Sequence, residues 1–307
     1  MTQTAAPPQA GPATTAPPAT RRPPGFLSVG WFTGPYLLAF ALFLAVPAAY
    51  GLWTSFTDQS LTGRETSFVG IANYVEALSD PKMWSALGNT LFFTLITTIP
   101  LVLVSLAMAL LVATGLPGQW LWRLSYFAPF LLASAVVSAI SLWIFQPGGG
   151  LVTGVLEYLG VAEIGWLTEE GVAMWSIAIV TLWWTVGFNF LLYLAAIQAI
   201  PDHLYEAAAI DGAGPLRRLM SITLPMLRRT TGLILLLQVL ASLKVFDQIY
   251  LITKGGPNDS TRPILEYIYD VGFTGYRLGY ASAISVIFFV LIMLVSLVQV
   301  IRSRREG

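Results

Sequence analysis

Six long apolar segments constrain this chain more than any other feature. A helix that crosses the hydrocarbon core of a bilayer needs about 20 mostly apolar residues. Six segments meet that condition, at roughly 31–56, 87–113, 124–146, 172–197, 231–252 and 278–301. Because lipid offers no hydrogen-bond partners, each segment has to satisfy its backbone N–H and C=O groups within a helix. The predicted fold class is therefore an all-α integral membrane protein with six transmembrane helices.

The composition agrees with this class and excludes several kinds of chemistry. Hydrophobic residues make up 56% of the 307 and charged residues only 10%, whereas soluble domains are roughly one quarter charged. The chain has no cysteine and a single histidine, His203. It therefore offers no thiol nucleophile, no nucleophile–base pair and no cluster of metal ligands. We predict no catalytic residue, no metal site and no cofactor bound by this chain.

The first 25 residues differ from the rest. They are rich in Pro, Ala and Thr, a composition that does not build a core, so residues 1–25 are predicted to be a disordered tail. Residues 26–307 are predicted to form one six-span domain. Within its spans we expect kinks rather than breaks at four prolines, Pro35, Pro47, Pro100 and Pro129.

The distribution of Lys and Arg predicts that both termini are cytoplasmic, because cytoplasmic loops carry an excess of basic residues. With that orientation the inner segments hold ten basic residues, Arg21, Arg22, Arg123, Arg217, Arg218, Arg228, Arg229, Arg302, Arg304 and Arg305. The outer loops hold five, Arg64, Lys82, Lys254, Arg262 and Arg277. Most of the acidic residues also fall in the outer loops.

A basic polar loop, residues 200–230, interrupts the membrane pattern between spans four and five. Pro201 and Asp202 favour a helix start, Gly212 to Gly214 favour a break, and Pro215 favours the first turn of a second helix. A cytoplasmic helix-turn-helix is therefore predicted. By composition alone it is either an amphipathic element on the membrane surface, with arginines on lipid phosphates, or a docking element for a cytoplasmic partner.

Polar groups inside spans are costly and tend to face a bundle interior or a water-filled path. Span four offers Asn189 and Tyr193 on one face, an amide and a phenol that suit hydroxyl recognition, and Trp183 or Trp184 is placed to stack on a sugar. Span five adds further candidates for the pathway, Gln238, Lys244, Asp247 and Tyr250. Lys244 and Asp247 are three residues apart on a predicted helix, so they share a face and are able to pair. They pair with each other, pair with a partner span, or contact solute. The alternative role for these two tryptophans is packing within the protein or contact with lipid.

The loop carries a spaced motif that resembles a known one. Its seven positions, Glu206, Ala207, Ala208, Gly212, Ile222, Leu224 and Pro225, look like the complete EAA loop of permease subunits in binding-protein-dependent ABC importers. The stretches "FVGIANY", "LGNT", "LLYLAAIQAIPDHLYEAAAIDGA", "FDQIYLITKGGP" and "GYASAIS" are similar to the carbohydrate-uptake branch, the type found in maltose and glycerol-3-phosphate importers. The resemblance covers all but about the first 25 residues.

This resemblance implies a mechanism and a set of partners. The loop would be a coupling helix seated on a cytoplasmic ATPase, with Glu206 as the ion-pairing residue and Gly212 as the turn. ATP and Mg²⁺ would bind to that partner ATPase, in agreement with the absence of a phosphate-binding loop in this chain. Two ATPase subunits, a second homologous permease and an extracytoplasmic solute-binding protein would complete the importer in the bacterial plasma (inner) membrane.

The function expected on these grounds is to form half of the translocation pathway for a carbohydrate. A neutral sugar is favoured because the spans contain amides and aromatic rings but no cationic cluster. The alternatives are an ion-gradient-driven secondary transporter, for which no internal repeat is visible, and a membrane receptor or intramembrane enzyme, for which no catalytic residue is visible.

Overall fold

The structure is a computed structural model that describes residues 26–63, 65–115 and 117–305. These described residues are mostly helical and contain no β-strand, only an isolated antiparallel bridge between Thr57 and Phe68. Five helices are long and apolar enough to cross a membrane, and a bent helix pair gives a sixth span if it is counted as one. The predicted all-α membrane class is confirmed. The predicted tail, residues 1–25, lies outside the described residues.

The described residues up to Tyr50 form one compact unit, and those from Gly51 onward form a second. The first holds α1 (Phe26–Phe40), the π-helical turn η1 (Ala41–Ala45) and the start of α2 (Val46–Thr54), which follow one another without a break. Pro35 lies inside α1, and η1 directly precedes the turn that contains Pro47. Because proline has no N–H to donate, a wider π turn accommodates the lost hydrogen bond without ending the helix. These two prolines leave the helix unbroken, as predicted.

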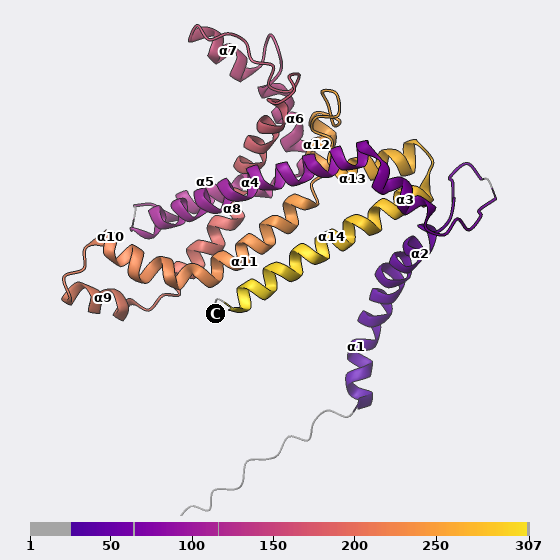
Figure 1. The fold of residues 1–307 in the computed structure, drawn as a ribbon. Coiled ribbons are helices and arrows are strands. Elements are labelled where there is room, and N and C mark those ends of the chain that lie inside the picture. The colour runs from indigo at the N-terminus through magenta and orange to yellow at the C-terminus, as the bar shows by residue number, and fades with distance from the viewer. Residues whose placement is uncertain (1–25, 64, 116, 306–307) are drawn as a thin grey trace, which may run out of the picture. The chain divides into compact units, whose positions relative to one another are not determined.

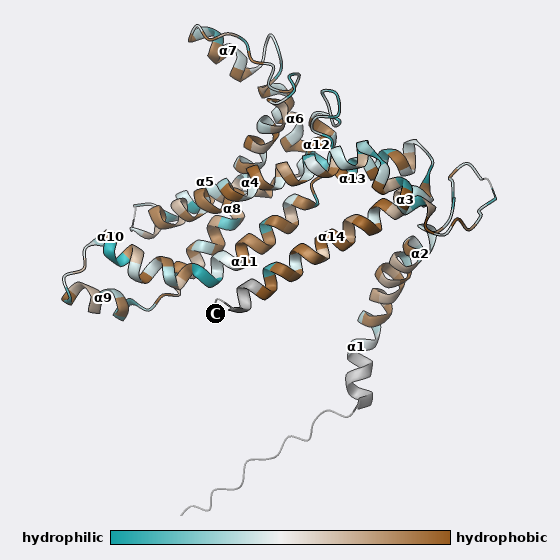
Figure 2. Cartoon of the chain, viewed as in Figure 1, coloured by the Kyte–Doolittle hydropathy of each residue, from teal (hydrophilic) through white to brown (hydrophobic). Residues whose placement is uncertain are grey.

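Three long helices build the core of the second unit. α4 (Pro81–Ala113) packs along α8 (Ala173–Gln198), and both pack against α11 (Leu224–Leu243). α14 (Leu278–Arg305) lies beside α11 (Figure 1). Hydrophobic residues run along α14, whereas hydrophilic residues gather at α10 (Pro215–Arg218) (Figure 2). Pro100 lies inside α4 without ending it.

The predicted third span, 124–146, is broken. α5 (Gln119–Phe127) and the 3-10 turn η2 (Ala128–Leu131) meet α6 (Ser134–Ile144) at a bend of 96°. Pro129 in η2 removes one backbone donor. The backbone carbonyl of Leu132 at the bend accepts a hydrogen bond from Trp184 Nε1 of α8 at 3.1 Å. The prediction that Pro129 only kinks the span is wrong. The helix breaks at this point, and the Trp184 side chain of α8 supplies a hydrogen bond to a backbone carbonyl that the break leaves without a helical partner.

The fifth span also differs from its predicted range, 231–252. α11 ends at Leu243, and α12 (Asp247–Ile252) begins a new helix after a non-helical Phe246 with φ −149° and ψ −65°. In the other direction, α10, the π turn η3 (Leu219–Thr223) and α11 are continuous, so the apolar helix covers Pro215–Leu243. The span is therefore shifted toward the N-terminus relative to the prediction.

The long helices connect two opposite ends of the second unit. At the α9 end, α9 (Asp202–Ile210) joins α8 to α10. At the α13 end, the spans are joined by shorter elements, α3 (Ala72–Ser79), α7 (Leu151–Tyr158), α12, α13 (Ile264–Tyr269) and the π turn η4 (Asp270–Thr274).

Candidate functional site

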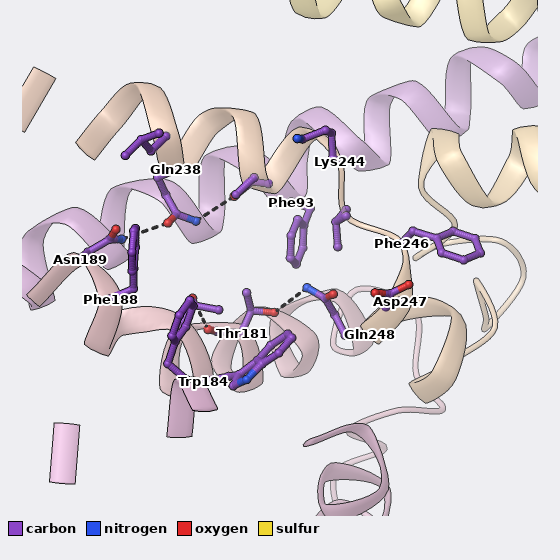
Figure 3. A pocket seen from close by; sticks show the side chains of 16 residues that line it. Phe93, Thr181, Trp184, Phe188, Asn189, Gln238, Lys244, Phe246, Asp247 and Gln248 are labelled. Atoms are coloured by element: carbon purple, nitrogen blue, oxygen red, sulfur yellow. Dashed lines mark hydrogen bonds between the residues drawn. The ribbon is translucent and has the colours of Figure 1, made fainter. Parts of the chain in front are cut away.

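A cavity of about 340 Å³ lies between α4, α8 and α11, beside the point where α11 ends. Four segments contribute its wall, which mixes aromatic rings with amides, hydroxyls and two charges (Figure 3). The lining residues that carry aromatic or polar groups are Phe93, Phe130, Thr181, Trp184, Thr185, Phe188, Asn189, Gln238, Ser242, Lys244, Phe246, Asp247 and Gln248.

The aromatic part of the wall is held in place by stacking between its own rings and by a hydrogen bond to the bend of the third span. The rings of Phe130 and Phe188 stack with centroids 5.3 Å apart and an interplanar angle of 24°. Trp184 is anchored through Nε1 to the carbonyl of Leu132 at the bend of the third span. The sequence left Trp183 and Trp184 as equal candidates for sugar stacking. The structure places Trp184 in the wall, while Trp183 lies outside it.

The threonine hydroxyls of α8 present acceptors to the cavity. Thr181 Oγ1 donates to the carbonyl of Ile177 at 2.8 Å, and Thr185 Oγ1 donates to the carbonyl of Thr181 at 2.7 Å. A hydroxyl has one hydrogen and two lone pairs, so both oxygens keep lone pairs for other donors. Gln248 Nε2 uses one of them, at 3.5 Å from Thr181 Oγ1.

A chain of hydrogen bonds runs from lining residues of α8 and α11 to α4. Asn189 Nδ2 donates to Gln238 Oε1 at 3.0 Å, and Gln238 Nε2 donates to Ser242 Oγ at 3.1 Å (Figure 3). Thr97 Oγ1 lies 3.1 Å from Ser242 Oγ and donates its hydrogen to the carbonyl of Phe93 at 2.7 Å. Since Thr97 has only one hydrogen, Ser242 must be the donor to Thr97. The chain therefore has a single direction.

This direction fixes which polar atoms remain for a solute. Asn189 is 1% exposed and Gln238 is 7% exposed, so bulk water does not supply hydrogen-bond partners to either amide. Asn189 lines the cavity and uses one N–H on Gln238, so its Oδ1 takes no part in this chain. The wall as a whole is rich in acceptors, namely Thr185 Oγ1, Asn189 Oδ1 and the carboxylate of Asp247.

Lys244 and Asp247 both line the cavity, but they do not form the pair that the sequence allowed. Lys244 follows the last residue of α11 and Asp247 opens α12, so the three-residue spacing does not place them on one helical face. Among the described residues no ion pair joins them, and they lie apart in Figure 3. The helical-face prediction is wrong because the helix ends between them. Both side chains are exposed in the isolated chain.

Two further predicted pathway residues lie outside the wall. Tyr193 is fully buried, and its hydroxyl donates to Thr231 Oγ1 at 3.2 Å, between α8 and α11. Tyr250 stacks on Phe246 with ring centroids 5.3 Å apart, and only Phe246 of the two lines the cavity. These phenols support the wall rather than forming it.

Several lining residues escaped the sequence analysis. Thr181, Thr185 and Phe188 follow the spacing of one helical face that also includes Asn189, and that periodic signal identifies them in retrospect. Phe130 and Gln248 had no such signal, because Phe130 reaches the cavity through the bend of the third span and Gln248 through the break after α11.

The α9 end carries the predicted helix-turn-helix. α9 begins after Pro201 and ends at Ile210, and Gly212 has the positive φ of +73° that reverses the chain before Pro215 opens α10. Two side-chain bonds close the turn: Tyr205 Oη lies 2.9 Å from Thr223 Oγ1, and Arg218 Nε donates to the carbonyl of Ala213 at 2.8 Å. The loop is thus a folded element fixed to the start of α11.

The surface of this loop combines exposed apolar side chains with exposed charged ones, among them Asp211 and Arg217. Ile210 is 88% exposed, Leu216 69% and Met220 60%, and Glu206 is exposed on α9. Of the other motif residues, Ala207, Gly212 and Pro225 are exposed, and Ala208, Ile222 and Leu224 are half-buried. Exposed apolar side chains gathered on a folded loop mark a surface that another molecule covers. In the described part of the chain no group of three or more His, Cys, Asp or Glu is placed to hold a metal ion.

The fold and the cavity define a multi-pass helical membrane protein with a polar, aromatic pocket between its spans. Residues 89–306 match the family described as binding-protein-dependent transport system inner membrane component. The chain is 36% identical over 273 residues to the sulfoquinovosyl glycerol transport system permease protein SmoG of Agrobacterium fabrum, covering 88% of this chain and 89% of the relative. It is 34% identical over 285 residues to the sn-glycerol-3-phosphate transport system permease protein UgpA of Yersinia pestis, covering 90% and 95%.

Solved structures share the fold. A crystal structure of a bacterial ABC transporter involved in the import of the acidic polysaccharide alginate contains a chain that matches with a TM-score of 0.80 and 24% identity, over 91% of this chain and 97% of that one. The same transporter in complex with an alginate pentasaccharide-bound periplasmic protein matches with a TM-score of 0.78.

This chain therefore belongs to the binding-protein-dependent transport system inner membrane components, the permease subunits of ABC importers. It is a transport subunit and not an enzyme, since the ATPase activity of such importers lies in a separate subunit. It is a multi-pass protein of the inner membrane.

Proposed function

We propose that this permease subunit forms half of the translocation pathway for a carbohydrate, and that the cavity between α4, α8 and α11 contacts the solute. The observation that carries the proposal is the composition of the wall: fixed acceptors from Thr185 and Asn189 beside the anchored ring of Trp184. Sugar hydroxyls donate to such acceptors, and the C–H face of a sugar packs on an aromatic ring. The names of the two relatives, which mention sulfoquinovosyl glycerol and sn-glycerol-3-phosphate, support this class.

The charge of the wall favours a neutral sugar. Lys244 and Asp247 contribute one positive and one negative charge, and the other polar groups of the cavity are uncharged. A solute with a phosphate or sulfonate group, as in the relatives' names, calls for an excess of cationic donors. In this wall the single Lys244 is matched by one carboxylate.

The test is uptake by cells that express the complete importer. We would compare labelled neutral mono- and disaccharides with sulfonated glycosides and sn-glycerol-3-phosphate, in the wild type and in Thr185→Val, Asn189→Leu and Lys244→Gln. A neutral-sugar pathway requires that Thr185→Val and Asn189→Leu reduce uptake about tenfold or more, which corresponds to at least one lost hydrogen bond of about 1.4 kcal/mol. Tyr193→Phe, outside the wall, is the matched control. Uptake of acidic solutes only, abolished by Lys244→Gln, would reject the neutral assignment.

The folded loop at the α9 end is proposed to be the coupling helix. Glu206 would pair with a basic residue of an ATPase subunit, while the exposed Ile210, Leu216 and Met220 would be covered by that subunit. The partners proposed for the importer are two ATPase subunits that bind ATP and Mg²⁺, a second homologous permease and a solute-binding protein. The solved complex with a periplasmic protein supports the last of these.

Capture of the ATPase tests the coupling role. The chain would be co-expressed with its companion permease and a tagged ATPase, intact or with Glu206→Ala together with Gly212→Asp. We expect the intact chain to be recovered with the ATPase and the double variant to be lost. Ser221→Ala, an exposed change on the same loop, should leave capture unchanged. If the intact chain, the double variant and Ser221→Ala are all recovered equally with the ATPase, the result favours a membrane-surface role for the loop.

The proposed orientation places both termini and the α9 end in the cytoplasm and the α13 end outside. The lack of cysteine in the sequence gives a direct test. Ile210 and Tyr158 are exposed to a similar extent, 88% and 90%, at opposite ends of the unit. The chain is expressed for this test without the ATPase, which would otherwise cover Ile210. In intact cells a membrane-impermeant maleimide should label Tyr158→Cys and not Ile210→Cys, and permeabilised cells should label both. The reverse pattern would invert the topology.

A further inference from the structure

Three carboxyl groups surround one arginine at the α13 end. Arg262 Nη2 lies 2.6 Å from Asp259 Oδ1, and Arg262 Nε lies 3.5 Å from Asp270 Oδ2. Glu266 lies in α13, four residues before Asp270, and Arg262 precedes that helix, but Arg262 and Glu266 both lie against Gly255. With every group ionised, the cluster would hold three negative charges and one positive charge.

Glu266 is the buried member of this cluster. The residue is only 2% exposed, and its Oε2 atom is buried with no hydrogen-bond partner. Arg262 Nε is also buried without a hydrogen bond, although it lies within ion-pair distance of Asp270. A buried carboxylate without a partner is costly, whereas a neutral carboxylic acid is tolerated far better. The geometry therefore favours a proton on Glu266.

The turn that follows α12 rests directly on Glu266. A Cβ atom added to Gly255 would lie 2.9 Å from Arg262 Cβ and 3.1 Å from Glu266 Oε1, so the backbone of the turn packs on both side chains. The turn, residues 254–262, is closed by Thr261 N donating to the carbonyl of Gly255 at 3.1 Å and by the pair between Arg262 and Asp259. A change in the charge of Glu266 therefore acts directly on the residues of the turn that it contacts.

The turn is also fixed from its other side. Asn89 Nδ2 of α4 donates to the carbonyls of Asp259 and Arg262, at 2.9 Å and 3.1 Å. Asn258 Nδ2 donates to Glu170 Oε1, before α8. These bonds fix the backbone of the turn between α4 and α8. The Arg262 side chain is therefore the part of the turn that is able to move from one carboxyl group to another.

Other titratable groups reach the cluster through a shared groove. Arg262 and Asp270 line this groove together with Tyr267 of α13 and with charged or phenolic residues from the starts of α4 and α14 and from α3, namely Glu76, Asp80, Lys82, Arg277 and Tyr280. From α12, Tyr250 is close enough to Glu266 for their charges to interact. The charges that act on Glu266 itself come from Asp270, Arg262 and Asp259.

We propose that Glu266 is a proton-binding site that controls the turn at residues 254–262. When Glu266 is protonated, Arg262 stays on Asp259 and closes the turn. When Glu266 loses its proton, its unpartnered oxygen attracts the guanidinium of Arg262, whose Nε is near Asp270 but makes no hydrogen bond. The Arg262–Asp259 pair then weakens and the turn loosens. The α13 end, which faces outside in the proposed topology, thereby responds to pH. Burial, with the nearby charge of Asp270, raises the pKa of Glu266 to about 7, despite the opposing charge of Arg262.

Hydrogen exchange of the full chain tests this proposal without a solute. The wild type and Glu266→Gln would be compared at the same pH, from about 5.5 to about 8.5, so that the intrinsic effect of pH on exchange cancels. We expect the amides of residues 254–262 to exchange alike in both proteins at the acid limit. At the alkaline limit the wild type should exchange about tenfold faster, with a midpoint near neutrality. Glu157→Gln, on the exposed face of α7, is the control and should follow the wild type.

Two further variants keep the test decisive. Asp259→Asn removes the pair that closes the turn, so it should exchange rapidly at every pH. If Glu266→Gln does not fold, Glu266→Met provides a neutral side chain of similar length. A ratio between the wild type and the neutral variant that stays constant with pH would overturn the proposal. Because exchange is measured on the chain itself, the result is independent of whether the solute is a carbohydrate.

Discussion

The hydroxyl of Tyr280 donates a hydrogen bond to Asp80 Oδ2 at 2.7 Å, across 200 residues of sequence. The hydroxyl of Tyr267 donates to the same oxygen, and Asp80 Oδ1 accepts from the backbone N–H of Lys82 at 2.9 Å in the first turn of α4. One carboxylate therefore joins the starts of α4 and α14 to α13. The spans at the two ends of the chain's second unit are connected through it.

Asp80→Ala should destabilise the protein by about 2 kcal/mol or more, because it removes the helix cap and leaves two phenols without their acceptor. Partial burial alone would raise the pKa of Asp80, but the bonds from Tyr267 and Tyr280 hold it below its usual value. The stabilisation from a lowered pKa is present above the unfolded value and is lost as pH falls below about 4. Thermal unfolding in detergent should show this acid loss in the wild type and a smaller one in Asp80→Ala.

The control for this variant is Glu76→Ala. Glu76 pairs with Arg277 at 2.6 Å on the same end, but both side chains are about half exposed, and such surface pairs contribute about 0–1 kcal/mol. An equal loss in the two variants would contradict a special role for Asp80.

Gly187 lies where α8 packs tightly against the backbone of the bent third span. A Cβ atom there would lie 2.2 Å from the carbonyl oxygen of Tyr126, which is backbone and has no freedom to move aside. Gly187→Ala should therefore separate the helices, cost about 1–3 kcal/mol or more, and distort the cavity wall at Phe130 and Phe188. Gly88→Ala in α4 has nothing within 4 Å of the added Cβ and should be neutral or slightly stabilising. Melting temperatures of the two variants decide between these outcomes.

The sequence predicted the helical class and the placement of most spans, because apolar length is a local property that lipid enforces directly. α8, predicted at 172–197, is found at Ala173–Gln198. The errors arose where tertiary contacts override local pattern. The apolar run 231–252 does not reveal that the chain leaves helical geometry at Phe246, and 124–146 does not reveal that Trp184 stabilises a 96° bend.

The cavity was likewise predicted in part: its polar residues were identified from the sequence, but their arrangement was not. Asn189, Gln238, Lys244 and Asp247 were identified from the sequence because polar groups at membrane depth are rare, and all four line the wall. Their mutual arrangement was not accessible. Whether Asn189 offers a donor or an acceptor depends on Thr97, which is 92 residues away in the sequence and lies on another helix.

Thr97→Val should weaken solute transport although Thr97 does not line the cavity. Without the Thr97 oxygen, Ser242 loses its acceptor and is free to donate back to Gln238, so the orientation of the Gln238 and Asn189 amides is no longer fixed. We expect KM for the transported solute to rise several-fold, with a loss of stability of about 1 kcal/mol. Thr97→Ser keeps the oxygen and should restore KM.

The neighbouring Thr98 provides a matched control for that experiment. Its Oγ1 is buried and has no hydrogen-bond partner, so Thr98→Val removes an unsatisfied polar atom while preserving shape, and should leave KM unchanged and stability equal or slightly higher. If Thr97→Val and Thr98→Val affect KM equally, the directed chain does not set the amide orientation.

Gly212 determines whether the loop at the α9 end keeps its fold. Its φ of +73° is strained for any residue with a side chain, although a Cβ there would meet nothing within 4 Å. Gly212→Ala should therefore cost about 1–2 kcal/mol through backbone strain alone, and it should reduce recovery of the ATPase because Ile210 and Leu216 on either side of the turn would shift. Gly214→Ala, at an ordinary φ of −69° and also with open space around its Cβ, should cost clearly less and retain the ATPase. Pull-down of the ATPase and the melting temperature would be measured on both variants. A folded docking element requires that Gly212→Ala and Gly214→Ala differ, whereas in a flexible linker the two variants would behave alike.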